Sequence, residues 1–388
     1  MMLPFVLTAV LAVTKAILVP GPPGPFPVAV RVQGFTDTSR LDPYAPKDRP
    51  HPRRVLISVF QPLEPRREYP TELVPYMPPQ TANVYGEQVA TLGLPNDTLA
   101  RFELEVPKLP TAGAEGKHHH EHRYPLVLFS PGYGVSRLVY SAGARALASR
   151  GYVVVTIDHP YDALIVEFPE GEVFLSANIS VEDPAELVKA VKVRAADASF
   201  IIDQFHNPSV LRNLTGGYPG RVDVEKLAMY GHSLGGATAA TAMLSDDRIL
   251  GGNNLDGPIL GPVVQKGLDR PFILAGIPGR DGLPSANWPE FYDNVRSAKM
   301  ALAIANTTHA SFFDVRLLFT AIDIPDKVKA GVDAALGTVD GRRLEDIMLG
   351  ILTGFLDLVF KAKAGRLRDI GRDFCEVAVV RSNLASRK

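Results

Sequence analysis

The chain has 388 residues, of which 46% are hydrophobic, so it is long enough to bury a substantial core. Its 41 basic and 42 acidic residues leave a net charge of −1, and this near balance argues against a polyanionic partner such as nucleic acid. The single cysteine, Cys375, excludes a framework of internal disulfides.

The N-terminus has the pattern of an export signal. Residues Leu3–Val13 form a short apolar block, and Thr14-Lys15-Ala16 then offers the small residues that a signal peptidase requires. The block is too short to cross a membrane. We therefore expect residues 1–16 to be a cleaved signal peptide and the protein to be secreted, with a cytoplasmic protein as the alternative. Four N-x-S/T sequons, which fit a secreted glycoprotein, begin at Asn96, Asn178, Asn213 and Asn306.

The first third of the chain predicts extended structure. The proline-rich residues 17–27 predict an extended lead-in, because proline can neither continue a helix nor donate to a sheet. Val28–Val32 and Arg54–Phe60 predict antiparallel strands, and the proline-rich residues 62–116 predict a long surface excursion. Residues 117–122 contain four histidines, but adjacent histidines in one loop cannot all reach one ion. We therefore expect a polar loop there and no metal site.

From residue 126 onward, continuous apolar runs alternate with helical segments. Such alternation is typical of a mostly parallel sheet with helices on both faces. No repeat and no second domain boundary is visible, so residues 17–388 are expected to form one domain. The predicted strands are 126–130, 152–157, 227–230, 249 onward, 272–275 and 300–304, and the predicted helices are 141–150, 184–204 and a long helix from 342.

The segment Gly231-His232-Ser233-Leu234-Gly235-Gly236 carries the most information about function. It lies between an apolar strand and a stretch of small, helix-forming residues. A strand, a G-x-S-x-G turn and a helix in that order predict the nucleophile elbow of an α/β-hydrolase fold. Gly231, Gly235 and Gly236 are expected to leave room for the strand and helix to pass, and Ser233 is the predicted nucleophile.

A serine hydroxyl needs a positioned imidazole to remove its proton. In α/β-hydrolases the catalytic residues run in the order Ser, acid, His, and the only histidine after Ser233 is His309. It follows the predicted strand 300–304, at the sheet edge where catalytic groups gather. His309 is therefore the predicted base, whereas His232 occupies a variable position of the elbow.

The acid has two candidates. Asp256 and Asp281 each follow a predicted strand, while Asp246 and Asp247 end the helix after the elbow and are expected to be solvated. Strand order alone favours Asp281 slightly, because many hydrolases of this fold take the acid from the later position.

The oxyanion hole requires two backbone N–H groups directed at the developing negative charge. One should come from Leu234, the residue after the nucleophile. The other should come from Tyr133, because Ser130-Pro131-Gly132-Tyr133-Gly134 is a glycine-bearing loop that directly follows an early strand. No cofactor is required for this chemistry.

Several segments resemble the platelet-activating factor acetylhydrolases of the plasma, lipoprotein-associated type. The similarity is scattered over residues 24–360 and includes residues 126–162, GHSLGGATA with LDG downstream, NTTHASFFD and PGPFPVAV. In that family the acid lies in an LD dipeptide shortly after the elbow, which matches Asp256, and the base matches His309. The family's oxyanion loop is H-G-x-G, and here Pro131 replaces the histidine.

The resemblance implies a calcium-independent serine esterase that removes short acyl groups from the sn-2 position of ether or oxidised phospholipids. Such an enzyme is a 1-alkyl-2-acetylglycerophosphocholine esterase, and its partner is a lipid ester. Two alternatives remain open: a cutinase-like, polyester or general carboxylesterase, and a non-catalytic binding module on the same fold. The apolar residues 317–319, with Ile322 and Ile324, fit either a lipid surface or the core. The long helix from 342 fits either packing on the sheet or contact with a second subunit, so the oligomeric state stays open.

Overall fold

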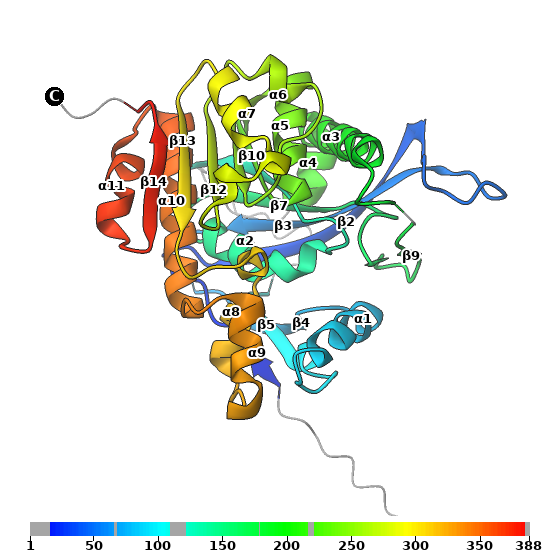
Figure 1. The fold of residues 1–388 in the computed structure, drawn as a ribbon. Helices are drawn as coiled ribbons and strands as arrows, with labels where there is room; N and C mark the ends of the chain where they lie inside the picture. The colour runs from blue at the N-terminus through cyan, green and yellow to red at the C-terminus, as the bar shows by residue number, and fades with distance from the viewer. Residues whose placement is uncertain (1–15, 66–67, 109–121, 178, 216–220, 385–388) are drawn as a thin grey trace, which may run out of the picture.

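The structure is a computed structural model that describes residues 16–65, 68–108, 122–177, 179–215 and 221–384 (Figure 1). The expected signal peptide, the sequon asparagine Asn178 and most of the histidine-rich loop lie outside the described residues. In the described ranges no helix is both long and apolar enough to cross a bilayer.

The described chain forms a nine-stranded central sheet with the order β14-β13-β12-β11-β10-β6-β7-β3-β2. The six strands from β13 to β7 run parallel to their neighbours, and the edge strands β14, β3 and β2 pair antiparallel. The α/β-hydrolase fold class predicted from the sequence is therefore confirmed. The strands are β2 (Val28–Leu41), β3 (Pro52–Pro62), β6 (Arg123–Ser130), β7 (Val153–Asp158), β10 (Arg221–His232), β11 (Ile249–Leu255), β12 (Phe272–Gly276), β13 (Lys299–Ile304) and β14 (Val377–Ser382).

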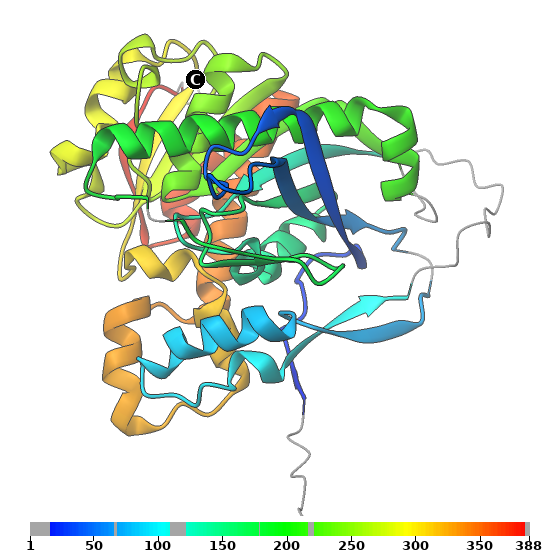
Figure 2. The ribbon, with the colours of Figure 1, turned by 90° about the vertical axis from the view of Figure 1, so that its right-hand side faces the viewer.

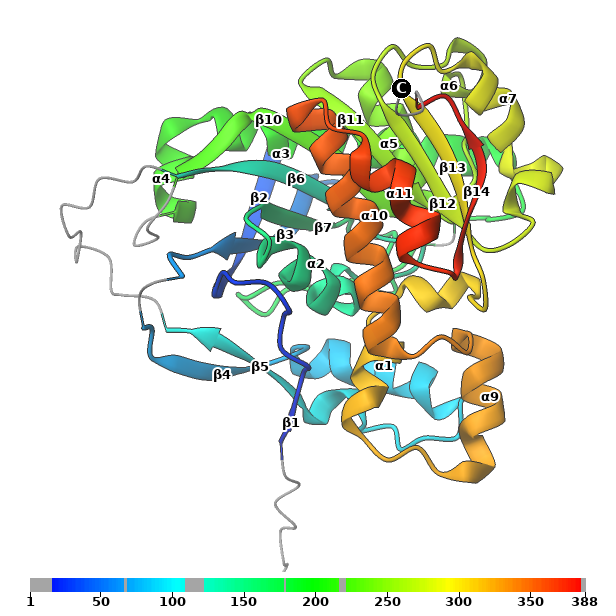
Figure 3. The ribbon, with the colours of Figure 1, turned by 90° about the vertical axis from the view of Figure 1, so that its left-hand side faces the viewer.

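Helices cover both faces of this sheet. One face, turned toward the viewer in Figure 2, carries α3 (Pro184–His206), α4 (Pro208–Thr215), α5 (Leu234–Ser245), α6 (Val263–Lys266) and α7 (Trp288–Asn294). The other, in Figure 3, carries α2 (Ser141–Ala148), α10 (Gly341–Lys361) and α11 (Gly365–Asp373). Each face has its own apolar cluster, because the central strands are buried on both sides and their side chains alternate between the faces.

Local sequence signals explain where the main helices start. The Asp183 side chain accepts a hydrogen bond from the Ala185 N–H, and Pro184 occupies the first turn of α3. Asp340 caps α10 in the same way. The apolar stripe of α10 is buried against α2, α8 (Val315–Leu318) and the sheet, so this stripe packs within the chain.

Residues 62–116 differ from the surface excursion expected from their prolines. They contain β4 (Thr71–Pro75), α1 (Pro79–Ala90), the short 3₁₀ turn η1 (Leu99–Arg101) and β5 (Phe102–Pro107). With β1 (Ile17–Leu18), the strands form a second sheet of order β1-β5-β4, which lies with α1, α8 and α9 (Asp326–Leu336) below the main sheet in Figure 1. Tyr76, Leu99 and Phe102 are buried there, because helices from distant parts of the sequence cover them.

The apolar residues after the base also belong to the core. Leu317, Leu318 and Phe319 are buried, and Ile322 and Ile324 pack against the same cluster. Leu317, Leu318 and Phe319 therefore belong to the core, whereas Ile322 and Ile324 remain partly exposed.

Candidate active site

Ser233 lies at the sharp turn between β10 and α5. Its backbone has φ 55° and ψ −125°, a strained conformation for a residue other than glycine. Strain of this kind is maintained only where the surrounding structure enforces it. The turn places the side chain of Ser233 at the carboxyl ends of the parallel strands, where ligands bind in open α/β sheets.

The three glycines of the elbow are required by close backbone contacts. A Cβ atom built on Gly231 would overlap the backbone of Gly235. A Cβ atom on Gly235 would overlap the carbonyl oxygen of Ser130, and one on Gly236 would overlap the side chain of Asn254. The elbow and the loop after β6 are therefore packed directly on each other.

The structure brings Ser233, His309 and Asp256 together from three separate strand ends. His309 begins the short 3₁₀ turn η5 (His309–Phe312) after β13, and Asp256 follows β11. The His309 Nε2 lies 2.9 Å from the Ser233 Oγ, and the His309 Nδ1 lies 2.5 Å from the Asp256 Oδ2. Within the described chain, His309 makes no such contact with Asp281, which lies in the 3₁₀ turn η3 (Arg280–Gly282).

Asp256 is held in an environment that keeps it ionised. Its side chain is fully buried, and its Oδ1 accepts hydrogen bonds from the Ile277 N–H and the Arg280 Nε, both at 2.9 Å. Its Oδ2 accepts from the Arg280 Nη2 at 2.5 Å. Burial alone would raise the pKa of Asp256, but the hydrogen bonds from Arg280, His309 and Ile277 outweigh it and lower the pKa to about 2.

Arg280 is a site residue that the sequence reasoning missed. Besides its two bonds to Asp256, its Nη2 lies 3.2 Å from the His309 Nδ1. In the sequence Arg280 directly precedes Asp281, a candidate acid, but a charged residue at that position carries no sign of a catalytic role. Its contact with Asp256, 24 residues away, arises only in the tertiary structure.

His232 packs directly behind His309. The centroids of the two imidazole rings are 4.6 Å apart, and the Phe312 ring stacks on the His232 ring. Burial, followed by repulsion from His309, lowers the pKa of His232 to about 3, so this ring is neutral at physiological pH. Its Nδ1 lies 2.8 Å from the hydroxyl of Tyr140, which in turn accepts from the Gly132 N–H.

The loop after β6 lies against the nucleophile. A Cβ atom built on Gly132 would lie 3.4 Å from the Ser233 Cβ, which places the loop in van der Waals contact with the elbow. In the described residues the Tyr133 N–H donates to no backbone carbonyl. The Leu234 N–H belongs to the first turn of α5, whose N–H groups have no acceptor within the helix. Both groups are available to an oxyanion at Ser233, with the positive end of the helix dipole behind it.

An apolar cavity of about 260 Å³ adjoins this site. Gly134 and Val135, which follow Tyr133, and Ala310, which follows His309, contribute to its wall. α1 and α9 contribute further wall residues, among them Tyr85, Val89 and Leu336, so the smaller sheet region borders the cavity. A cavity of about 150 Å³ accommodates benzene, so a short acyl chain fits within this one.

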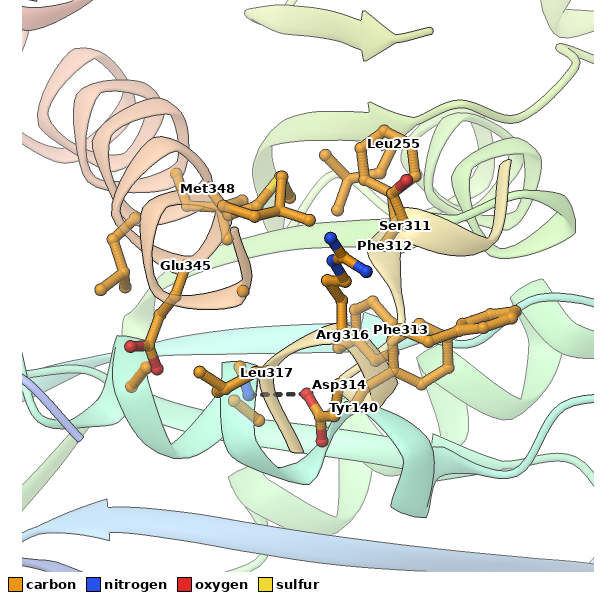
Figure 4. A pocket seen from close by; sticks show the side chains of 18 of the residues that line it. Tyr140, Leu255, Ser311, Phe312, Phe313, Asp314, Arg316, Leu317, Glu345 and Met348 are labelled. Carbon is orange, nitrogen blue, oxygen red and sulfur yellow. Dashed lines mark hydrogen bonds between the residues drawn. The ribbon is translucent and has the colours of Figure 1, made fainter. Parts of the chain in front are cut away.

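A second, smaller cavity of about 70 Å³ is lined by residues 311–314, the segment that follows His309 (Figure 4). Asp314 projects from this segment and accepts a hydrogen bond at 3.0 Å from the Gly143 N–H at the start of α2 (Figure 4). It also accepts from the Tyr76 hydroxyl and the Ala142 N–H. Burial nevertheless raises the pKa of Asp314 to about 7. Asp314 therefore connects the His309 segment to α2 and to the smaller sheet region.

In the described part of the chain, no group of three or more His, Cys, Asp or Glu side chains is arranged to hold a metal ion. The chemistry available at Ser233 is thus that of a serine nucleophile with an adjacent imidazole, a buried carboxylate and two free backbone donors.

Comparison with known proteins points to esterases. The family described as platelet-activating factor acetylhydrolase, isoform II, matches residues 88–170. A protein of Arthroderma benhamiae, named "Probable 1-alkyl-2-acetylglycerophosphocholine esterase", is 29% identical over 382 residues, which are 94% of both chains. The platelet-activating factor acetylhydrolase of Cavia porcellus is 26% identical over 217 residues, and the match spans 50% of this chain and 49% of that protein.

Among solved structures, the ferulic acid esterase of Streptomyces cinnamoneus is similar over nearly the whole chain. The match has a TM-score of 0.74 and 28% identity, and covers 95% of this chain and 100% of the other. The similarity thus extends across both the main sheet and the smaller sheet region.

Proposed function

Because the chain belongs to the platelet-activating factor acetylhydrolase family, we propose that it is a serine esterase that hydrolyses short sn-2 acyl esters of phospholipids, as a 1-alkyl-2-acetylglycerophosphocholine esterase does. The observation that carries the proposal is the hydrogen-bonded set of Ser233, His309 and Asp256. Ala310, the residue after His309, lines an apolar cavity. The esterase relatives support the reaction class, and the cavity supports an acyl substrate.

In the proposed reaction, His309 removes the proton from Ser233 as the hydroxyl oxygen attacks the ester carbonyl. Asp256 holds the imidazole with its Nδ1–H directed inward and stabilises the imidazolium. The Tyr133 and Leu234 N–H groups stabilise the tetrahedral oxyanion. His309 then protonates the leaving lysophospholipid oxygen, and water activated by the same ring releases the acid from the acyl-serine.

The size of the cavity supports a short acyl group. Its lining is almost wholly aliphatic and aromatic, and its volume of about 260 Å³ suits an acetyl or slightly longer chain. Long acyl chains require more room, so turnover should fall steeply as the sn-2 chain lengthens.

A second candidate is a general carboxylesterase, which the likeness to the ferulic acid esterase favours. A direct competition separates the two: the enzyme is given an sn-2 acetyl ether phosphocholine, its palmitoyl counterpart, a feruloyl ester and a polyester film. Preference for the acetyl phospholipid by at least tenfold in kcat/KM supports the main proposal. Preference for the feruloyl ester or the film replaces it by the second candidate.

The catalytic assignment is tested by Ser233→Ala and His309→Ala. Each should lower kcat by about 10⁴-fold or more while the fold is retained, as judged by circular dichroism. A fluorophosphonate probe should label the wild-type chain and not Ser233→Ala. Near-wild-type turnover by either variant would show that the catalytic assignment is wrong, and absence of labelling of the wild type would favour the non-catalytic binding module.

We also propose that the enzyme is secreted and glycosylated, on the basis of the apolar block Leu3–Val13 and the sequons. The sequon residues Asn96, Asn213 and Asn306 are exposed. Expression of the full chain in a eukaryotic host, followed by N-terminal sequencing and glycosidase treatment of the medium, tests both points. Retention of residues 1–16 on an intracellular product would refute secretion.

A further inference from the structure

Arg194 of α3 is buried directly beneath the loop that carries Tyr133. Its side chain is 1% exposed. Its Nη1 donates to the Pro131 carbonyl at 2.6 Å, and its Nη2 donates to the Gly132 carbonyl at 3.1 Å. One guanidinium therefore binds two consecutive carbonyl groups of this loop.

The second of these carbonyls determines where the Tyr133 N–H points. The Gly132 C=O and the Tyr133 N–H belong to the same peptide group, and no cis peptide occurs in the described chain. In a planar trans peptide the C=O and the N–H point in opposite directions. Because Arg194 holds the carbonyl toward α3, the N–H must face away from α3. The same loop lies against the nucleophile, since a Cβ atom built on Gly132 would be 3.4 Å from the Ser233 Cβ.

Asp162 fixes Arg194 from the other side. Its Oδ2 accepts from the Arg194 Nε at 2.8 Å, and its Oδ1 accepts from the Nη2. The planar fork of an arginine can serve a carboxylate and two carbonyls at once, whereas the ammonium group of a lysine has three donors at a single point. The position therefore requires an arginine for geometric reasons as well as for its charge.

A buried serine, histidine and aspartate brace the same loop. The Ser130 Oγ lies 3.0 Å from the His159 Nε2, and the His159 Nδ1 lies 2.8 Å from the Asp197 Oδ2. The three side chains are buried, so the Ser130 hydroxyl is closed to a substrate although the residue types repeat those of the active site. They anchor the start of the loop that Arg194 orients.

We infer that Arg194 is a positioning residue for the oxyanion hole: it sets the Gly132–Tyr133 peptide so that the Tyr133 N–H is preorganised to bind the tetrahedral oxyanion. The inference rests on the proposed function. Its signature is selective: loss of Arg194 weakens binding of the transition state and leaves binding of the ground-state ester nearly unchanged.

The test compares Arg194→Lys with Arg145→Lys. Arg145 is a buried arginine of α2 whose Nη2 donates to the Glu105 carbonyl, and in the described chain it makes no hydrogen bond with the loop after β6. Each variant is assayed on a chromogenic acetyl ester for kcat and KM. Each is also titrated with a trifluoromethyl ketone, which forms an oxyanion on the active serine, and with an uncleavable ether analogue of the ester.

For Arg194→Lys we expect kcat to fall about 10- to 100-fold with KM within twofold, since removal of a whole oxyanion donor costs about 10²–10³-fold. The Ki of the ketone should rise by the same factor, and the Ki of the ether should not change. Arg145→Lys should leave kcat and the Ki of the ketone within twofold of the wild-type values, because Arg145 makes no hydrogen bond with the loop in the described chain. An unchanged kcat in folded Arg194→Lys, or a fallen kcat with an unchanged ketone Ki, would overturn the inference.

If Arg194→Lys does not fold, Asp162→Asn decides the question. This substitution keeps the size of the side chain and removes the charge that fixes Arg194. We expect kcat and ketone affinity to fall together, by less than the roughly 10²-fold cost of losing a whole oxyanion donor. A folded Asp162→Asn enzyme with wild-type values of both refutes the inference.

The test also separates this inference from the proposed substrate. A wild-type enzyme that cleaves the chromogenic ester but no acetyl phospholipid contradicts the substrate and still allows the Arg194 comparison. A wild-type chain that cleaves no ester and takes no fluorophosphonate label contradicts both.

Discussion

Replacement of Asp256 by asparagine should distinguish the proposed acid from its rival, Asp281. The amide keeps the shape of the side chain and can still accept from the Ile277 N–H. It cannot supply the negative charge that faces Arg280 and a protonated His309. In a Ser-His-Asp protease the same exchange lowers kcat about 10⁴-fold with the geometry intact, so we expect a loss of similar size for Asp256→Asn.

The structure also gives the expected cost in stability. The pKa of Asp256 is lowered from 3.8 to about 2, and each unit corresponds to about 1.4 kcal/mol, so the ionised side chain stabilises the folded state by about 2 kcal/mol. The folded-state pKa lies below the unfolded-state pKa. This stabilisation is therefore complete above about pH 4 and is lost only as the pH falls toward 2. Asp256→Asn should accordingly lower the free energy of unfolding by about 2 kcal/mol at pH 7.

The assay measures kcat on a chromogenic acetyl ester and urea unfolding at pH 7, with Asp281→Asn as the matched control. In the described chain the partners of His309 are Ser233, Asp256 and Arg280 and not Asp281, so the amide variant of Asp281 should keep wild-type values of both. More than a tenth of wild-type kcat in Asp256→Asn would refute the reasoning. An equal loss in the control would transfer the role to Asp281.

Three further outcomes are expected. Gly235→Ala should abolish activity and destabilise the fold by at least about 2 kcal/mol in thermal unfolding, because its Cβ would overlap the Ser130 carbonyl. The control is Gly331→Ala in α9, where a Cβ meets no other atom. This variant should be neutral or more stable by up to about 1 kcal/mol. Ala335→Phe should fill the 260 Å³ cavity and lower kcat/KM for hexanoyl esters at least tenfold while acetyl esters change less than threefold; equal losses would place the acyl chain elsewhere. Because the pKa of Asp314 is raised in the folded state, the folded protein keeps a proton on this carboxyl that the unfolded chain releases. The free energy of unfolding should therefore fall as the pH rises from about 4 to 7. In urea unfolding, Asp314→Asn should make this decline smaller.

The parts of the fold that the sequence predicted are those determined by local pattern. Continuous apolar runs marked β6, β7, β12 and β13 to within one or two residues, apart from the first residues of β6. The glycine spacing located the elbow, because the tight turn at Ser233 allows no larger residue at those positions. Only one histidine, His309, follows Ser233 in the sequence, so it is the predicted base. The structure places it beside Ser233.

The remaining parts depend on contacts between distant segments. The prolines of residues 62–116 obscured the strand and helix pattern of the smaller sheet region. Tyr76 and Leu99 are buried only because helices from other parts of the chain cover them. Strand order alone slightly favours Asp281 as the acid, whereas the structure brings Asp256 to His309. The family resemblance favours Asp256, but the residues alone do not show how the η3 turn directs Asp281. From the sequence, an arginine in a helix is expected to be exposed to solvent. Only the contacts of Arg194 with Asp162 and the loop carbonyls indicate that it orients the loop.

The direct pairing of β6 with β10, in which Ser130 lies opposite Gly231, has a consequence for refolding. The nucleophile and the loop beside it are the ends of two adjacent strands, so neither can adopt its working conformation before these strands join. The residues concerned are about 100 positions apart, and closing so long a loop is a slow step. Regain of hydrolysis after dilution from denaturant should therefore follow the formation of the central sheet and lag behind the early helical signal.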